Sequence, residues 1–69
     1  MNYEEQTIID FLKQCPDNFF GRKEIARKAV RRSEFEENPH WADVPLAALA
    51  DQKLIEIDNG NLYRFKADR

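Results

Sequence analysis

The most informative local sequence in the chain is Leu54-Ile55-Glu56-Ile57-Asp58-Asn59-Gly60-Asn61-Leu62-Tyr63-Arg64-Phe65. Two alternating apolar runs flank Asn59-Gly60, a pair that favours tight turns, and together they predict a β-hairpin. A two-residue Asn59-Gly60 loop would place Ile55 opposite Arg64 and Ile57 opposite Leu62, and a slip of one residue moves every side chain to the other face. A three-residue loop with Gly60 as a bulge pairs Ile55 with Tyr63 and gathers the apolar side chains on one face: Ile55, Ile57, Tyr63 and Phe65. We expect the second register because it buries these side chains together.

Helical periodicity precedes this hairpin, beginning with residues 3–15. Ile8, Phe11, Leu12 and Cys15 recur at the three- and four-residue spacing of one helical face. Pro16 ends the helix, because proline disfavours helical geometry in the residue before it. The sequence therefore predicts an amphipathic helix with Cys15 on its buried side.

A second helix is predicted over residues 22–32, after a short β-bridge at Phe19-Phe20. Small apolar residues form one face of this helix: Ile25, Ala26, Ala29 and Val30. Its basic residues lie beside and opposite that face, which predicts a helix packed on one side and cationic on the other.

Two further helix starts follow in the sequence. Ser33 with Glu36 has the S/T-x-x-E form of a capping box, so an extra helical turn is expected there. The sequence of residues 33–42 as a whole is compatible with either a helix or a loop. Asp43 precedes Val44-Pro45 and is expected to cap a helix reaching about Lys53. The buried stripe of that helix is predicted to be Leu46, Leu49, Ala50 and Leu54.

Length and composition indicate one small domain spanning residues 1–69. The chain has 69 residues and one cysteine, so an intrachain disulfide is impossible and a reducing compartment is favoured. The longest apolar run, residues 46–50, is far below the ~20 residues of a membrane span. The first residues lack the basic start and apolar stretch of a signal peptide. We expect a soluble cytoplasmic domain without a membrane partner.

The net charge of −2 conceals a strong asymmetry along the chain. Residues 22–32 contain six basic side chains and only Glu24 as an acid, a net charge of +5. Residues 33–58 contain seven acids and only Lys53 as a base, a net charge of −6. On a continuous helix Lys23, Arg27 and Arg31 would form one ridge at i, i+4 and i+8, with Glu24 placed to pair with Lys28. Such asymmetry indicates partners better than the total charge does.

The order of elements resembles a winged helix-turn-helix domain. The resemblance rests on residues 19–26 and 46–56, with Leu62-Tyr63-Arg64-Phe65 as the return strand of the wing. It implies an α+β fold of three helices and a C-terminal β-hairpin, and DNA binding with the third helix in the major groove. Two features depart from that pattern. About ten residues, from Ser33 to Ala42, separate the second and third helices, where a turn of 3–4 is usual. The outer face of the third helix carries Val44, Ala48, Asp51 and Gln52, of which Gln52 alone suits base reading.

The leading functional hypothesis is a nucleic-acid-binding domain, such as a transcriptional regulator, that contacts the phosphates of duplex DNA through the basic helix and the hairpin. The candidate contacts are Arg22, Lys23, Arg27, Lys28, Arg31, Arg32, Arg64 and Lys66. A solvated helix face with paired charges is the plainer interpretation. The acidic stretch 34–37 could likewise mask these cations or serve only as an exposed, solubilising segment.

The alternative hypothesis is a protein-interaction module, homodimer included, that uses the basic ridge or an apolar patch of Trp41, Val44, Pro45 and Ala48. Trp41 could instead fold back onto the core, and we favour that placement slightly.

Catalytic signals are weak in this sequence. Cys15 and His40 are single residues far apart along the chain, and a nucleophilic pair needs hydrogen-bond contact. Zinc-ligand spacing, a phosphate-binding glycine loop and a recognisable carboxylate pair are missing from the sequence. We therefore expect no enzymatic activity, cofactor, metal or small-molecule site.

Overall fold

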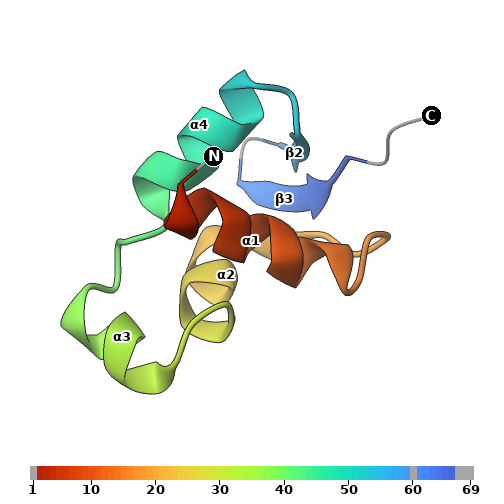
Figure 1. The fold of residues 1–69 in the computed structure, drawn as a ribbon. Coiled ribbons are helices and arrows are strands. Elements are labelled where there is room, and N and C mark those ends of the chain that lie inside the picture. Colours follow the sequence, from red (N-terminus) through yellow and green to blue (C-terminus); the bar gives the residue numbers. More distant parts are fainter. Residues whose placement is uncertain (1, 60, 67–69) are drawn as a thin grey trace.

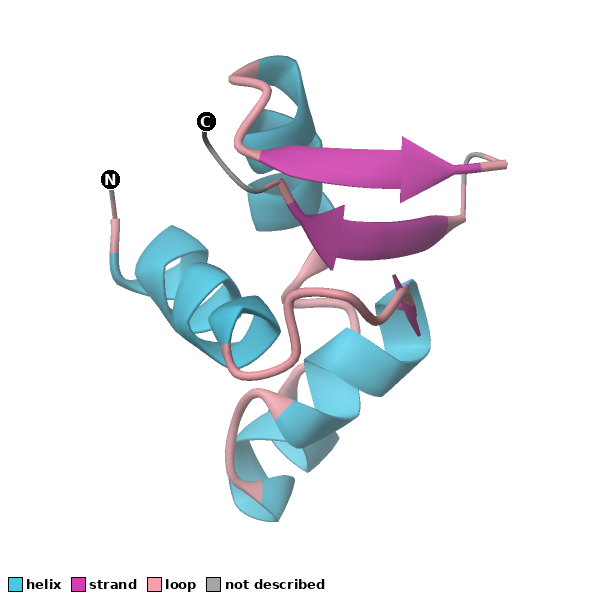
Figure 2. Ribbon diagram, turned by 90° about the vertical axis from the view of Figure 1, so that its right-hand side faces the viewer, coloured by secondary structure: helices cyan, strands magenta, loops and turns pink. Residues whose placement is uncertain are grey.

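A computed structural model describes residues 2–59 and 61–66. Within these residues the chain forms four helices and three strands: α1 (Tyr3–Lys13), β1 (Phe20–Gly21), α2 (Arg22–Lys28), α3 (Arg32–Glu37), α4 (Asp43–Asp51), β2 (Ile55–Asp58) and β3 (Leu62–Phe65). The fold is α+β, with one helix more than the three expected. The strands form an antiparallel sheet in the order β1-β3-β2. Figure 1 shows α1 beneath β3 and α4 beside β2, whereas α3 lies at the far end of the molecule from the sheet, as Figure 2 also shows.

Helix α1 begins at a reciprocal cap and ends earlier than expected. The backbone N–H of Glu5 donates to Asn2 Oδ1 at 2.8 Å, and the backbone N–H of Asn2 donates to Glu5 Oε1 at 3.2 Å. Ile8 and Leu12 are fully buried, as the periodicity predicts. The prediction for Cys15 is wrong: its thiol is exposed, because the helix ends at Lys13 and Cys15 lies in the following turn.

Strands β2 and β3 pair in a register that differs from the expected one. Ile55 lies opposite Phe65, and Ile57 lies opposite Tyr63, so the predicted Ile55–Tyr63 pair is wrong. The apolar face is nevertheless the predicted one, because a shift of two residues returns each side chain to the same side of the sheet. Asn59 adopts the left-handed conformation with φ 56°. The expected bulge at Gly60 lies outside the described residues.

The short strand β1 confirms the expected bridge and places it beside the return strand. Phe20 pairs with Tyr63 and Gly21 with Leu62. The ring of Phe20 also lies 5.0 Å from that of Phe11 in α1, centroid to centroid. This bridge brings the start of α2 next to β3.

Helix α2 ends at Lys28, four residues before the predicted end, and a side chain from outside the helix binds a carbonyl in its last turn. Trp41 Nε1 donates to the carbonyl of Ala26 at 2.9 Å. In a longer helix that carbonyl would accept from the N–H of Val30. The last helical bond instead runs from Ala29 N–H to Ile25 O, and the backbone is extended at Arg31. The predicted ridge of Lys23, Arg27 and Arg31 is therefore wrong for its third member, which lies outside α2.

The starts of α3 and α4 also differ from the expected caps. Helix α3 begins at Arg32, and Glu34 Oε1 accepts from the backbone N–H of Arg31 at 3.2 Å, so Ser33 is not the cap. Helix α4 has Ala42 as its N-cap, and Asp43 lies in the first turn. The cap is displaced because the chain already has helical geometry at Ala42, whose carbonyl accepts from the N–H of Leu46 at 2.9 Å.

One apolar cluster joins the helices to the sheet. Its fully buried side chains come from three helices: Ile8, Leu12, Ile25, Leu46 and Leu49. Ile55 and Tyr63 close the cluster from the inner face of the sheet. Trp41, only 9% exposed, joins the same cluster, which confirms its placement in the core.

We predict that Trp41→Ala lowers the free energy of unfolding by about 3–5 kcal/mol, the cost of removing a large buried aromatic side chain. A chain of this length has only roughly 3–10 kcal/mol in total, so the variant should be largely unfolded at moderate urea concentration. Trp41→Phe keeps an aromatic ring but leaves the carbonyl of Ala26 without its donor, and should cost about 1–3 kcal/mol. Val44→Ala, at a side chain that is 78% exposed, is the control and should change stability by about 0.5 kcal/mol or less. Equal urea midpoints for Trp41→Ala and Val44→Ala would contradict the placement of Trp41.

Candidate nucleic-acid interface

Three cations on the surface of α2 and at the start of α3 are free of ion pairs. Lys23 and Arg27 lie one turn apart on the outward side of α2, opposite the buried Ile25 and Ala26. Arg31 lies in the extended residue before α3 and is also exposed. Lys23, Arg27 and Arg31, here called the open cations, form no ion pair with any residue that the structure describes. Their charge is available to a partner.

The other three cations of this segment are each beside a carboxylate. Arg22 Nε lies 3.5 Å from Asp43 Oδ1, Lys28 Nζ 2.9 Å from Glu24 Oε2, and Arg32 Nε 2.9 Å from Glu36 Oε2. The Glu24–Lys28 pair confirms the expectation from the sequence. These pairs are exposed, so each stabilises the fold by ~1 kcal/mol at most and can open at little cost. The acidic stretch 34–37 pairs with one of the six cations, Arg32, so its masking of the basic segment is slight among the described residues.

Glu24 shows the electrostatic effect of its basic neighbours. The hydrogen bond from Lys28 holds the pKa of the Glu24 carboxyl below its ordinary value, and the charge of Arg27 adds a smaller effect in the same direction. The carboxylate therefore stays ionised to lower pH than a free glutamate does.

Arg64 in β3 and Lys66, directly after that strand, differ in whether their side chains are available to a partner. The guanidinium of Arg64 lies 4.5 Å above the ring of Phe19, and its Nε donates to Glu56 Oε1 at 3.0 Å. Both interactions hold Arg64 against the sheet, so it is engaged within the domain. Lys66 has an exposed side chain, and its backbone N–H donates to the carbonyl of Leu54 at 3.3 Å.

The four residues of the predicted apolar patch do not share one surface. Trp41 and Pro45 are buried and Ala48 is half-buried, whereas Val44 is 78% exposed. The prediction of this patch is therefore wrong. Pro45 lies on the inner side of α4, and the buried Trp41 packs in the core and donates a hydrogen bond to α2. The outward face of α4 instead presents Val44, Ala47 and Asp51, and helical spacing could have identified Ala47 as its third member.

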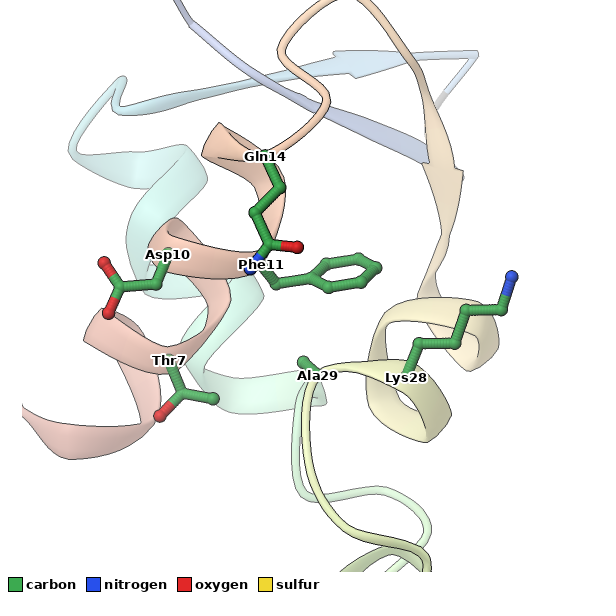
Figure 3. A pocket seen from close by; sticks show the side chains of 6 residues that line it. All are labelled: Thr7, Asp10, Phe11, Gln14, Lys28 and Ala29. Carbon is green, nitrogen blue, oxygen red and sulfur yellow. The ribbon is translucent and has the colours of Figure 1, made fainter.

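A depression of about 280 Å³ lies between α1 and α2. Figure 3 shows the ring of Phe11 reaching toward α2 and Asp10 pointing away from that ring. Asp10 Oδ1 accepts from Gln6 Nε2 at 2.9 Å, and the amino group of Lys28 is paired with Glu24. The charged groups beside this depression already have partners.

A second concavity, of about 340 Å³, lies where α2 meets the sheet. Gly21, Arg22 and Lys23 line it from the β1–α2 junction, and Asn61 and Tyr63 line it from the end of the turn and from β3. Neither Asn61 nor Tyr63 was expected beside these cations, because only the pairing of β1 with β3 brings the two residues to Arg22 and Lys23.

Cys15 and His40 form no recognisable catalytic arrangement with their neighbours. Cys15 is exposed in the turn after α1, and the ring of His40 has Nδ1 3.7 Å from Asp43 Oδ2. Residues 2–59 and 61–66 contain no group of three or more His, Cys, Asp or Glu side chains placed to hold a metal ion. Within that same part of the chain, every helix is too short or too polar to cross a membrane.

We predict that Lys28→Gln raises the pKa of Glu24 toward its ordinary value, because it removes the hydrogen bond that lowers it. Since the pKa of Glu24 is depressed in the folded state, its contribution to stability is present above the unfolded pKa and is lost as the pH falls through the folded pKa. NMR titration of the Glu24 carboxyl carbon measures the shift directly. Lys66→Gln removes a cation outside α2 and should leave the Glu24 titration unchanged. An unaltered Glu24 pKa in Lys28→Gln would show that the pair does not form in solution.

No family model, curated protein or solved structure matches this chain significantly, so its fold and surface chemistry alone bear on its function.

Proposed function

We propose that this chain is a winged-helix domain that binds duplex nucleic acid through the phosphate backbone. The order of elements along the chain, with α1, β1, α2 and α4 preceding the β2–β3 pair, supports this proposal because it is the order on which the resemblance rests. In this interpretation β2 and β3 form the wing, α4 takes the place of the third helix, and α3 is an inserted helix.

The observation that carries the proposal is the set of open cations Lys23, Arg27 and Arg31 on a chain whose net charge is −2. A negatively charged protein repels a polyanion unless its cations are concentrated in one place. Lys23 and Arg27 are four residues apart on one side of α2, about 6 Å along the helix axis, so their long side chains can reach different phosphates of one strand, which repeat every ~3.4 Å along the duplex axis. Arg22, Lys28 and Arg32 can join them when their exposed ion pairs open.

Helix α4 offers little for reading base sequence. Its outward side chains are Val44, Ala47 and Asp51, and none of them is a bidentate partner for a guanine or adenine edge. The carboxylates of Asp43 and Asp51 would also repel phosphates. We therefore propose binding with little sequence preference, dominated by phosphate contacts.

We predict that the chain binds a 20-base-pair duplex at 50 mM salt and that the affinity falls steeply toward 200 mM salt. The double variant Lys23→Gln/Arg27→Gln should weaken binding and reduce the slope of log affinity against log salt by about 1.8, since each lost phosphate contact removes about 0.9. Fluorescence anisotropy with a labelled duplex gives both quantities. Two duplexes of different sequence and equal length should give the same result.

The matched control is Lys13→Gln/Lys53→Gln, which removes the same charge from residues outside α2 and α3. It should change the slope by much less than the Lys23/Arg27 variant does. Equal slopes for the two double variants would assign binding to overall charge and overturn the proposed surface. A wild-type chain without duplex affinity at micromolar concentration and 50 mM salt would overturn the function itself.

A second candidate function, protein contact, is favoured by the outward face of α4. Val44 is 78% exposed beside the exposed Ala47, and no basic residue lies within Asp43–Asp51. An exposed apolar side chain on a helix face whose charged residues are acidic is better suited to contact with another protein than to contact with DNA.

This candidate, taken with a second copy as the partner, predicts that amide signals of Val44, Ala47 and Asp51 move with protein concentration in NMR spectra. Val44→Asp should abolish the concentration dependence, whereas Tyr3→Asp, at a large side chain of α1 that is 73% exposed, should keep it. Spectra that stay constant from micromolar to millimolar protein would contradict self-association through α4.

A further inference from the structure

The concavity between α2 and the sheet has a lining suited to a single phosphate group. Its side chains are Arg22, Lys23, Asn61 and Tyr63, all able to donate hydrogen bonds, and no carboxylate is among the described residues that line it. The fifth lining residue, Gly21, adds no side chain to obstruct the opening. The volume of about 340 Å³ accommodates a phosphate with room for its substituent.

Tyr63 is the least expected member of this lining. Its side chain is only 8% exposed, and its hydroxyl makes no hydrogen bond to any residue that the structure describes. Tyr63 lines the concavity with a ring that is packed in the core. We infer that its hydroxyl serves there as a donor whose position is held by that ring.

The charges around the concavity are arranged in favour of an anion. Arg22 Nε lies 3.5 Å from Asp43 Oδ1 in an exposed pair, and the guanidinium, which has five N–H donors, can turn to a bound anion at little cost. Lys23 forms no ion pair with a described residue. The nearby carboxylate of Asp58 lies opposite Leu62 in the sheet, on the face away from Tyr63.

We propose that Arg22, Lys23, Asn61 and Tyr63 form a specific phosphate-binding site at the junction of α2 and β3. This inference rests on the proposed nucleic-acid function and deepens it, because it names one site that fixes the position of a phosphate, whereas the open cations supply attraction. The phosphate can belong to the backbone as a diester or to a strand end as a monoester. Both present anionic non-bridging oxygens that accept hydrogen bonds.

Inorganic phosphate is the first probe, observed through amide NMR signals at constant ionic strength. Saturable shifts are expected at Gly21, Arg22, Lys23 and Asn61, and not with chloride. Tyr63→Phe retains the buried ring and removes one donor to a charged acceptor, so phosphate affinity should fall about tenfold. Asp43→Asn removes the carboxylate that pairs with Arg22, so phosphate affinity should rise. Lys53→Gln, at an exposed residue outside the concavity and outside the proposed nucleic-acid contacts, is the control and should leave it unchanged.

Duplexes with a 5′-phosphate and with a 5′-hydroxyl distinguish the two phosphate sources. Equal affinities assign the site to backbone phosphates, whereas tighter binding of the phosphorylated duplex assigns it to a strand end. In either case Tyr63→Phe should weaken binding of the duplex that occupies the site.

Phosphate shifts that are linear, that also occur with chloride, or that persist unchanged in Tyr63→Phe would overturn the site. If one of these results is found and the chain still binds duplex with its full salt slope, the phosphate site is refuted and the proposed nucleic-acid function is retained. A saturable phosphate site in a chain without duplex affinity would show the reverse, a real anion site with the nucleic-acid function refuted.

Discussion

The hydrogen bond from the indole of Trp41 to the carbonyl of Ala26 is the interaction on which the arrangement of this domain depends. It engages a carbonyl in the last turn of α2, at the place where that helix ends. It also ties the segment before α4 to the middle of α2, which brings Asp43 within 3.5 Å of Arg22. A net hydrogen bond contributes only about 1 kcal/mol, but the buried indole that carries it adds several more through packing. The position of α4 relative to α2 follows from this contact.

The same contact decides how the basic segment is presented. In one continuous helix Lys23, Arg27 and Arg31 would form a single ridge, but the break after Lys28 gives Arg31 and Arg32 to a separate element. Half of the six cations are then held beside carboxylates, and the open cations remain for a partner. The near-neutral total of the chain is thus a balance between local pairing and local excess, and the excess lies on α2 and at the entry to α3.

Local patterns predicted the elements, and contacts distant in sequence decided where they end and meet. The alternation around Asn59-Gly60 was sufficient to predict the strands and which side chains share a face, although Ile57 of that face is 46% exposed. Two registers that differ by two residues place the same side chains on one face, so the pattern does not choose between them. Ala29 and Val30 continue the apolar face of α2, so periodicity extends that helix, whereas its observed end lies at a contact with Trp41, fifteen residues from Ala26. The cations of the candidate site could be predicted from the concentration of basic residues in residues 22–32. The contribution of Asn61 and Tyr63 could not, because it arises from the pairing of β1 with β3.

Hydrogen exchange of the Trp41 indole proton tests the central claim most directly. In the folded domain this proton donates to a buried backbone carbonyl, so it should exchange about as slowly as the backbone amides of Leu12 and Ile25, which require the core to open. The exchange rate is read from the indole signal in a series of NMR spectra after transfer to heavy water. Protection equal to that of the core amides is the result that this account predicts. Exchange as fast as that of a free indole would contradict it, because the indole would then not be bound to the carbonyl of Ala26 and would not tie the segment before α4 to α2.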